Sequence, residues 1–150
     1  MIEYYVYTDG ACSNNGKEIA KAGIGIYFQD NDSRNVSKRI TGKQTNNRAE
    51  LLAIIVAYFI IEKDVDAGKT IVIVTDSEYS IRCFTTYGEK CEKQGWKKDI
   101  PNKELVRQGY ELFKDTPTIS LKHVRAHTGA TDVHSIGNAK ADAFATQCLL

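Results

Sequence analysis

The sequence predicts an α/β fold in which helices cover a mixed sheet. Three short extended stretches come first, at residues 2–9, 22–29 and 36–41, and polar turns separate them. A long apolar stretch at 47–63 then precedes a β-branched strand at 70–75. Strands joined by short turns pair antiparallel, whereas a strand, helix, strand order implies a right-handed parallel crossover. We therefore expect antiparallel strands first and parallel strands after them.

The first strand is expected to run from Ile2 to Asp9. Its Tyr and Val residues favour the extended chain. Gly10 follows Asp9 and allows a sharp turn because it has no Cβ. The next strand, 22–29, contains glycines that indicate close approach of another backbone or a ligand. The strand at 36–41 is predicted at the sheet edge, since Lys38 and Arg39 break its apolar face.

The stretch after Asn46 has helical character up to about Lys63. Asn47 can cap the first turn, with Glu50 three residues later as in a capping box. Its apolar residues cover more than one face, so the helix should be heavily buried on the sheet. They are Leu51, Leu52, Ile54, Ile55, Tyr58, Phe59 and Ile61. The unbroken β-branched run at 70–75 suits a central strand covered on both faces.

The second half of the chain is predicted to alternate helices with one further strand. Ser77 and Asn102 are candidate helix caps. Trp96 and Tyr87 lie in a charged segment to which no element is assigned. The expected elements are a helix at 78–86, a helix at 103–114, a strand at 118–124, a polar loop at 125–137 and a helix at 138–147.

Composition bounds the kind of protein. The 150 residues, 42% apolar and 26% charged, fit one soluble domain, 1–150. Because the sequence begins almost at the first strand, we expect no separate domain before it. A net charge of +1 decides nothing about a polyanionic partner. The four cysteines form no C-x-x-C pair, there is no signal peptide, and the longest apolar run is too short to cross a bilayer. We expect no membrane association and a cytoplasmic, nuclear or virus-encoded intracellular protein that is not secreted.

Four acids stand out by position. Asp9 and Asp76 follow apolar strands, Glu50 lies in the first turn of a helix, and Asp142 lies in the last helix. Ligands gather at the carboxyl ends of such strands, and clustered carboxylates suit hard cations such as Mg²⁺ or Mn²⁺. Each acid also has a purely structural interpretation, as a turn residue, half of a capping box or a solvated helix residue. The residues alone leave both interpretations open.

The histidines and the basic segment at 90–107 also allow both a functional and a structural interpretation. His127 lies in a polar loop with Gly129 and could move a proton, although an ordinary surface histidine is the alternative. His123 and His134 are weaker candidates. The lysines and arginines at 90–107, with aromatics interleaved, could hold a polyanion or form a solvated helical face.

Five motifs together resemble the type 1 ribonuclease H family in order and spacing. The likeness covers nearly the whole chain. The motifs are Tyr7-Thr8-Asp9-Gly10, Gln44-Thr45-Asn46-Asn47-Arg48-Ala49-Glu50-Leu51, Thr75-Asp76-Ser77, His123-Val124-Arg125-Ala126-His127-Thr128-Gly129 and Gly137-Asn138-Ala139-Lys140-Ala141-Asp142.

The resemblance implies a ribonuclease H-like fold, with a five-stranded mixed sheet and helices on both faces. It implies a monomeric endonuclease that cuts the RNA strand of RNA–DNA hybrids and leaves 5′-phosphate and 3′-hydroxyl ends. Asp9, Glu50, Asp76 and Asp142 match the family's carboxylates, which hold two Mg²⁺ ions, with Mn²⁺ as a substitute. His127 matches a mobile histidine that helps proton transfer or product release.

The resemblance also implies contacts with the hybrid. Residues that match readers of the RNA are Cys12, Asn15, Asn46 and Asn47. Lys43, Thr45 and Asn102 match a pocket for a DNA phosphate, and Tyr79 and Tyr87 match aromatics along the DNA channel. Three departures stand out: Glu78 replaces a common Gln or Met near the RNA, Lys43 replaces an Arg of some relatives, and the loop before Asp142 is longer. Two rival functions are a non-catalytic hybrid-binding domain and an integrase-like or transposase-like DNA strand-transferase.

Overall fold

Five strands form one mixed sheet in the computed structural model, which describes residues 1–150. The strands are β1 (Tyr4–Ser13), β2 (Lys21–Tyr27), β3 (Val36–Arg39), β4 (Ile71–Thr75) and β5 (Ile119–His123), in the spatial order β3-β2-β1-β4-β5. The pairs β1–β2 and β2–β3 are antiparallel, and the pairs β1–β4 and β4–β5 are parallel. The predicted arrangement of strands is confirmed.

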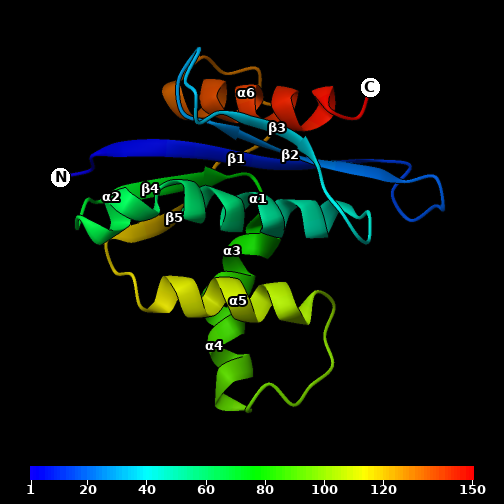
Figure 1. Ribbon diagram of the computed structural model, residues 1–150, viewed down its shortest axis with the longest axis vertical. Helices are drawn as coiled ribbons and strands as arrows, with labels where there is room; N and C mark the ends of the chain where they lie inside the picture. The colour runs from blue at the N-terminus through cyan, green and yellow to red at the C-terminus, as the bar shows by residue number, and fades with distance from the viewer.

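Helices cover both faces of this sheet, as predicted. They are α1 (Asn46–Ile60), α2 (Glu62–Asp66), α3 (Glu78–Phe84), α4 (Thr86–Lys93), α5 (Lys103–Lys114) and α6 (Val133–Gln147). Figure 1 shows α6 alone on one face, with α1 and the α3–α5 group on the other. None of the helices combines the length and the apolar composition needed to cross a membrane.

The hydrophobic core is divided unequally between the two faces. On the α1 face, side chains of α1 such as Leu51 and Ile54 pack with Ile73 of β4 in one large cluster. On the α6 face a small cluster contains Tyr7, Val72, Val74 and Ala141. Every residue of β4 is buried, as its β-branched sequence predicts. Phe59, expected to lie inward on α1, is 46% exposed instead.

The predicted end of the first strand is wrong. β1 continues past Asp9 to Ser13, and Gly10 pairs with Ile24 of β2 rather than starting a turn. A Cβ at Gly10 would overlap the backbone at Ala49 and Glu50. Gly10 is thus needed because α1 crosses β1 at this point, and not because the chain turns.

The helix boundaries also correct the sequence analysis. α6 begins at Val133, five residues before its predicted start, and the Asp132 side chain caps it by accepting a hydrogen bond from Ser135 N. α4 lies where no element was assigned. Thr45, and not Asn47, caps α1. Ser77 caps α3 as predicted, whereas Asn102 precedes α5 in a left-handed conformation without a capping hydrogen bond.

Candidate active site

Three of the four predicted acids meet at one edge of the sheet. Asp9 lies on β1, Asp76 directly follows β4, and Glu50 lies in the first turns of α1. The parallel register aligns Thr8 with Thr75, so the next residues of the two strands, Asp9 and Asp76, are neighbours. One carboxylate oxygen from each of the three acids lies within 4.8 Å of the others.

The approach of α1 to β1 brings Glu50 into this cluster. The Gly10 N–H donates a hydrogen bond of 2.8 Å to Oε1 of Glu50. The capping bond of α1 is made instead by Thr45, whose hydroxyl accepts from Arg48 N at 3.2 Å. Glu50 is therefore not half of a capping box, and its carboxylate is directed to the sheet edge.

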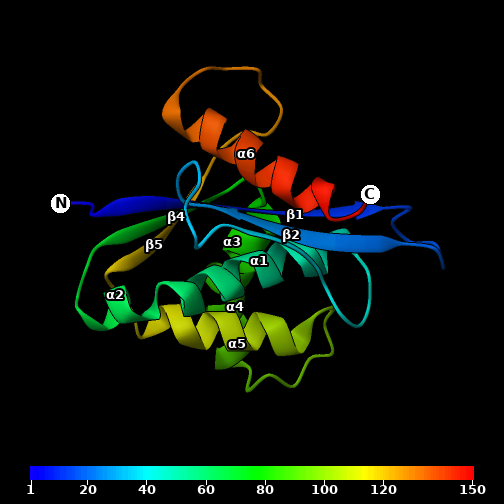
Figure 2. The same ribbon diagram turned by 45° about the horizontal axis from the view of Figure 1, so that its top comes forward.

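Asp142 approaches the cluster from the opposite face of the sheet. It lies on α6, is half-buried, and is close enough that its side chain and its charge both raise the pKa of Asp9. Figure 2 shows the segment before α6 arching away from the sheet, after which α6 returns across it. The two faces of the sheet thus each supply one helix-borne carboxylate.

The cluster concentrates negative charge in a buried place. Asp9 and Glu50 are only 4% and 6% exposed. Burial is the largest cause of the raised pKa of both carboxyls, and the neighbouring carboxylates, Glu50 and Asp76 for Asp9 and Asp76 for Glu50, raise the pKa further. None of the seven ion pairs of the protein involves any of the four acids. Asp9, Glu50 and Asp76 could therefore bind a metal, and their oxygen-only donors suit hard divalent cations.

His127 lies beside the fourth carboxylate. It is in the loop between β5 and α6 and has a left-handed backbone conformation with φ 54°. A cavity of about 280 Å³ is lined by both His127 and Asp142. The other two histidines lie elsewhere: His123 faces Glu78 at 3.9 Å, and His134 packs against Tyr7.

A polar groove adjoins the cluster on the α1 face. Its volume is about 610 Å³. Six of the predicted substrate contacts line it: Asn15, Lys43, Thr45, Asn46, Asn47 and Asn102. A second cavity of about 320 Å³ is lined by Tyr79 and Tyr87, and it shares Asn47 and Pro101 with the first. The structure thus brings eight predicted contacts together along one continuous surface.

The two other predicted contacts lie outside these cavities. The Cys12 thiol points at the Gln44 carbonyl oxygen, 3.7 Å away, and burial raises its pKa. The Glu78 side chain is 63% exposed and faces His123. The charge that Glu78 introduces, where family members often carry Gln or Met, therefore lies in solvent at the start of α3.

Sequence reasoning missed the residues that shape the groove. The Arg48 guanidinium donates to the backbone carbonyls of Thr41 and Lys43, the latter at 3.0 Å. Gln44 accepts from Ala22 N at 2.7 Å and donates to Gly42 O at 2.9 Å. Both residues belong to the second motif, so the signal was present, but the motif did not indicate that Gln44 bonds β2 or that Arg48 bonds the loop before α1.

The aromatic part of the basic segment at 90–107 is mainly structural. Trp96 is 7% exposed and packs against Tyr110, with a ring-centroid distance of 6.2 Å. Arg107 lies over the Trp96 ring and also pairs with Glu111. Trp96 is therefore unavailable for stacking on bases or sugars, contrary to one interpretation of the sequence.

Comparison with known proteins places these features in a family. The RNase H family profile matches residues 2–149. Ribonuclease H of Schizosaccharomyces pombe is 39% identical over 145 residues, which cover 93% of this chain and 50% of that protein. Ribonuclease H1 of Mus musculus is 36% identical over 146 residues, which cover 95% of this chain and 48% of that protein. The chain spans about half the length of these relatives.

The fold agrees with this assignment. The solution structure of the PFV RNase H domain matches with a TM-score of 0.74 and 25% sequence identity, covering 96% of this chain and 92% of that one. The resemblance predicted from the five motifs is confirmed. The chain belongs to the RNase H family.

Proposed function

We propose that the protein is an endonuclease that hydrolyses the RNA strand of RNA–DNA hybrids. The observation that carries this proposal is the gathering of four carboxylates at one sheet edge, without a basic partner, beside a polar groove. Such a charge cluster is costly unless cations neutralise it. The membership of the chain in the RNase H family supports the reaction class.

Asp9, Glu50, Asp76 and Asp142 would hold two Mg²⁺ ions, which Mn²⁺ could replace. The bound cations would supply activation of a water and stabilisation of the leaving oxygen in phosphodiester hydrolysis. Hard cations prefer oxygen donors, and all four side chains supply only oxygen. The Gly10 N–H holds Glu50 at the sheet edge, so part of the ligand set is positioned before any ion binds.

The groove would select the hybrid. Amide side chains of Asn15, Asn46 and Asn47, with Cys12 nearby, would face the RNA strand, where only ribose offers 2′-hydroxyls. A DNA phosphate would be held by Lys43, Thr45 and Asn102, which line the same groove. The DNA strand would also contact the two aromatic residues of the neighbouring cavity, Tyr79 and Tyr87. Glu78 lies near these contacts in sequence, and its charge would weaken the approach of a phosphate backbone.

His127 would take part in proton transfer during cleavage or product release. It is exposed, lies on a loop, and shares a cavity with Asp142. Histidine side chains are common proton carriers in catalysis. Cleavage would leave a 5′-phosphate and a 3′-hydroxyl.

We further propose that the protein is a monomer, because one chain supplies all four acids and the groove. We also propose an intracellular location, because all four cysteines are free.

The direct test is cleavage of a labelled RNA–DNA hybrid with Mg²⁺ or Mn²⁺. The protein should cut the RNA strand, and Asp76→Asn should lose the activity. Asp99→Asn, which removes the same charge from an exposed position, is the matched control and should cleave like the wild type. If the wild type fails to cut the hybrid in the presence of either metal, the proposal is overturned. Tight hybrid binding without turnover would favour a binding domain, and preferential cutting of duplex DNA would favour a strand-transferase.

A further inference from the structure

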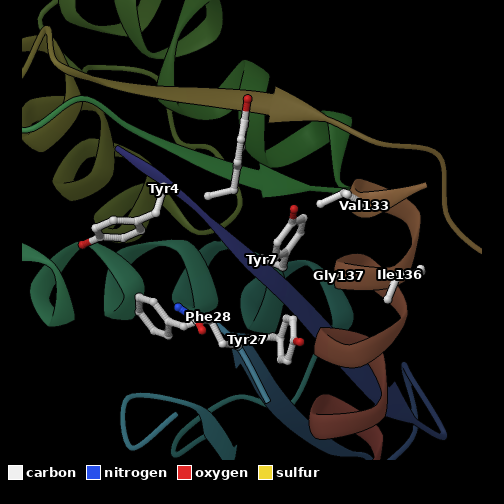
Figure 3. Close-up of a pocket in the computed structure, with 9 residues that line it drawn as sticks. Tyr4, Tyr7, Tyr27, Phe28, Val133, Ile136 and Gly137 are labelled. Carbon is white, nitrogen blue, oxygen red and sulfur yellow. The ribbon is translucent and has the colours of Figure 1, made fainter. Parts of the chain in front are cut away.

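A tyrosine–histidine pair joins α6 to the sheet. Tyr7, on β1, is 4% exposed, and its Oη lies 2.9 Å from Nδ1 of His134 in the first turn of α6. The Tyr5 ring meets the His134 ring edge-on, with centroids 4.6 Å apart. Figure 3 shows Tyr7 projecting from β1 toward α6, close to Gly137. His134 lies within the part of the chain that was expected to be a loop.

Close packing holds α6 at two places along its length. A Cβ on Gly137 would lie 2.5 Å from the Tyr7 ring, so the helix backbone rests directly on that ring. Further along, a Cβ on Gly25 of β2 would overlap the backbone at Ala141. Asp142 adjoins this second contact. The two contacts fix how close α6 lies to the sheet, and a hydrogen bond adds a preferred direction to this packing.

The Tyr7–His134 contact is the directional one. It joins a side chain near the N-terminal end of α6 to a side chain of the sheet, whereas Asp142 approaches Asp9 two turns further along the helix. The other polar links of α6 are peripheral: Ser37 Oγ donates to Phe144 O at the β3 edge, and Lys140 faces Asp30 at 3.5 Å in an exposed ion pair. His134 therefore supplies a directional side-chain contact that orients the N-terminal end of α6 on the sheet.

The same strand that carries this contact carries the central acid. Tyr7 and Asp9 are two residues apart on β1, so their side chains point to the same face. His134 and Asp142 are eight residues apart on α6, a rise of about 12 Å at 1.5 Å per residue. A small rotation of α6 about His134 would therefore move Asp142 relative to Asp9.

We propose that Tyr7 and His134 are positioning residues that set α6 so that Asp142 completes the carboxylate cluster. This inference rests on the proposed metal-binding function of that cluster. A tyrosine hydroxyl can donate to Nδ1 or accept from it, so the bond is available to either tautomer and to the protonated ring. The pair therefore acts through geometry and not through a change of charge.

The test measures Mn²⁺ binding by calorimetry in the absence of substrate. Tyr7→Phe removes only the hydroxyl, and His134→Leu keeps bulk but removes the polar ring. We expect each to weaken Mn²⁺ binding by about three- to tenfold, less than the 10–100-fold seen for groups bonded directly to metal ligands. The double variant should be no weaker than either single variant, because both remove the same bond.

Conservative replacement separates positioning from stability. His134→Asn keeps a polar atom at the position of Nδ1 and should restore most of the Mn²⁺ affinity lost in His134→Leu. Val133→Ala, in the same turn but 71% exposed, is the control and should bind Mn²⁺ like the wild type. Binding is measured well below the unfolding temperature of each variant, so a fall in thermal stability alone does not change the result.

Three outcomes would count against the inference. Wild-type affinity in both Tyr7→Phe and His134→Leu would overturn it, and so would an Asn variant as weak as the Leu variant. Additive losses in the double variant would show that the two residues act separately. Failure of the wild type itself to bind Mn²⁺ would instead overturn the proposed metal site, so the two failures are distinguishable.

Discussion

The two helices that carry carboxylates of the site contact the sheet in different ways. α1 crosses β1 at Gly10, its Glu50 is 6% exposed, and the Gly10 N–H bonds the Glu50 carboxylate directly. α6 covers a small cluster on the other face, its Asp142 is half-buried, and its His134 bonds a side chain of the sheet two turns away.

This difference indicates that one face of the sheet serves folding and hybrid binding, whereas the other serves turnover and metal binding. The α1 side contains most of the core and the polar groove, so changes there should affect folding and hybrid binding. The α6 side contains Asp142 and the exposed His127 loop, so changes there should affect turnover and metal affinity while the fold persists. Five predictions test this separation.

The largest difference is expected between Asp9→Asn and Asp142→Asn. Asp9 is influenced by all three other acids, so its loss should lower turnover by about a thousandfold or more. Asp142 lies at the periphery, and its loss should lower turnover by about ten- to a hundredfold. Steady-state cleavage of a labelled hybrid measures both. Equal losses would contradict the central position assigned to Asp9.

Gly10→Ala should damage the fold itself. The new methyl group would overlap backbone at Ala49 and Glu50, which cannot move aside as a flexible side chain can. We expect a loss of about 3 kcal/mol in the free energy of unfolding, at the upper end for overpacking. Gly68→Ala, where φ is +78° and space is open, is the control and should cost about 1 kcal/mol. Denaturant unfolding measures the free energy of unfolding of both variants. A loss for Gly10→Ala no larger than that for Gly68→Ala would show that α1 can shift away from β1.

His127→Ala should act on turnover and leave binding nearly intact. Removal of a group that transfers protons lowers kcat by about a hundredfold. KM for the hybrid should stay within about threefold, because His127 does not line the groove. His123→Ala, which removes an exposed histidine facing Glu78, is the matched control and should keep kcat. A rise in KM as large as the fall in kcat would place His127 in substrate binding instead.

Stability without metal should fall as pH rises. The pKa values of Asp9 and Glu50 are raised in the folded state by burial and by neighbouring carboxylates. Above the ordinary carboxyl pKa of about 4, the folded state therefore binds more protons than the unfolded state, and each added pH unit disfavours folding. We expect a loss of about 2 kcal/mol between pH 5 and pH 8 in a chelator.

Two comparisons check the origin of this pH dependence. Glu50→Gln should flatten the decline, because one buried ionisable group is removed. Addition of Mn²⁺ should flatten it as well, since bound cations favour the ionised carboxylates. Chemical unfolding at each pH provides the measurement. Stability that rises between pH 5 and pH 8 would show that the buried acids do not carry the expected repulsion.

The smallest effect is expected at the groove. Lys43→Ala removes one exposed cation that lines it, so KM for the hybrid should rise by about three- to tenfold with kcat unchanged. The slope of log affinity against log salt concentration should become shallower by about 1. Lys63→Ala, an exposed lysine of α2 outside the groove, is the control. A fall in kcat for Lys43→Ala would mean that the groove also aligns the reacting strand.

The sequence predicted the order of strands because their signals are local. The β-branched run of β4 and the apolar residues of α1 identify buried elements without knowledge of their partners. The first turn of α6 was missed because Asp132, His134 and Ser135 are polar and resemble a loop. Their roles depend on a cap and on contacts with Tyr5 and Tyr7, more than 120 residues away in the chain.

The site was predictable in its residue types but not in its geometry. Positions at strand ends and in helices singled out the four acids, but only the family motifs favoured a metal-binding role over a purely structural one. The bond from Gly10 to Glu50 was not foreseen, because the strand was expected to end at Asp9, one residue before Gly10. Gln44 and Arg48, which shape the groove loop, were quoted within a motif without a role. Gln44 bonds Ala22 on β2, and Arg48 bonds the loop just before α1, whose conformation the sequence did not predict.

The most direct test of the proposed metal site is a crystal structure of the protein soaked in Mn²⁺, with anomalous diffraction used to locate the ions. We expect two Mn²⁺ ions among the carboxylates of Asp9, Glu50, Asp76 and Asp142. Crystals with Mn²⁺ bound elsewhere, or with no ion among these four carboxylates at saturating Mn²⁺, would contradict it.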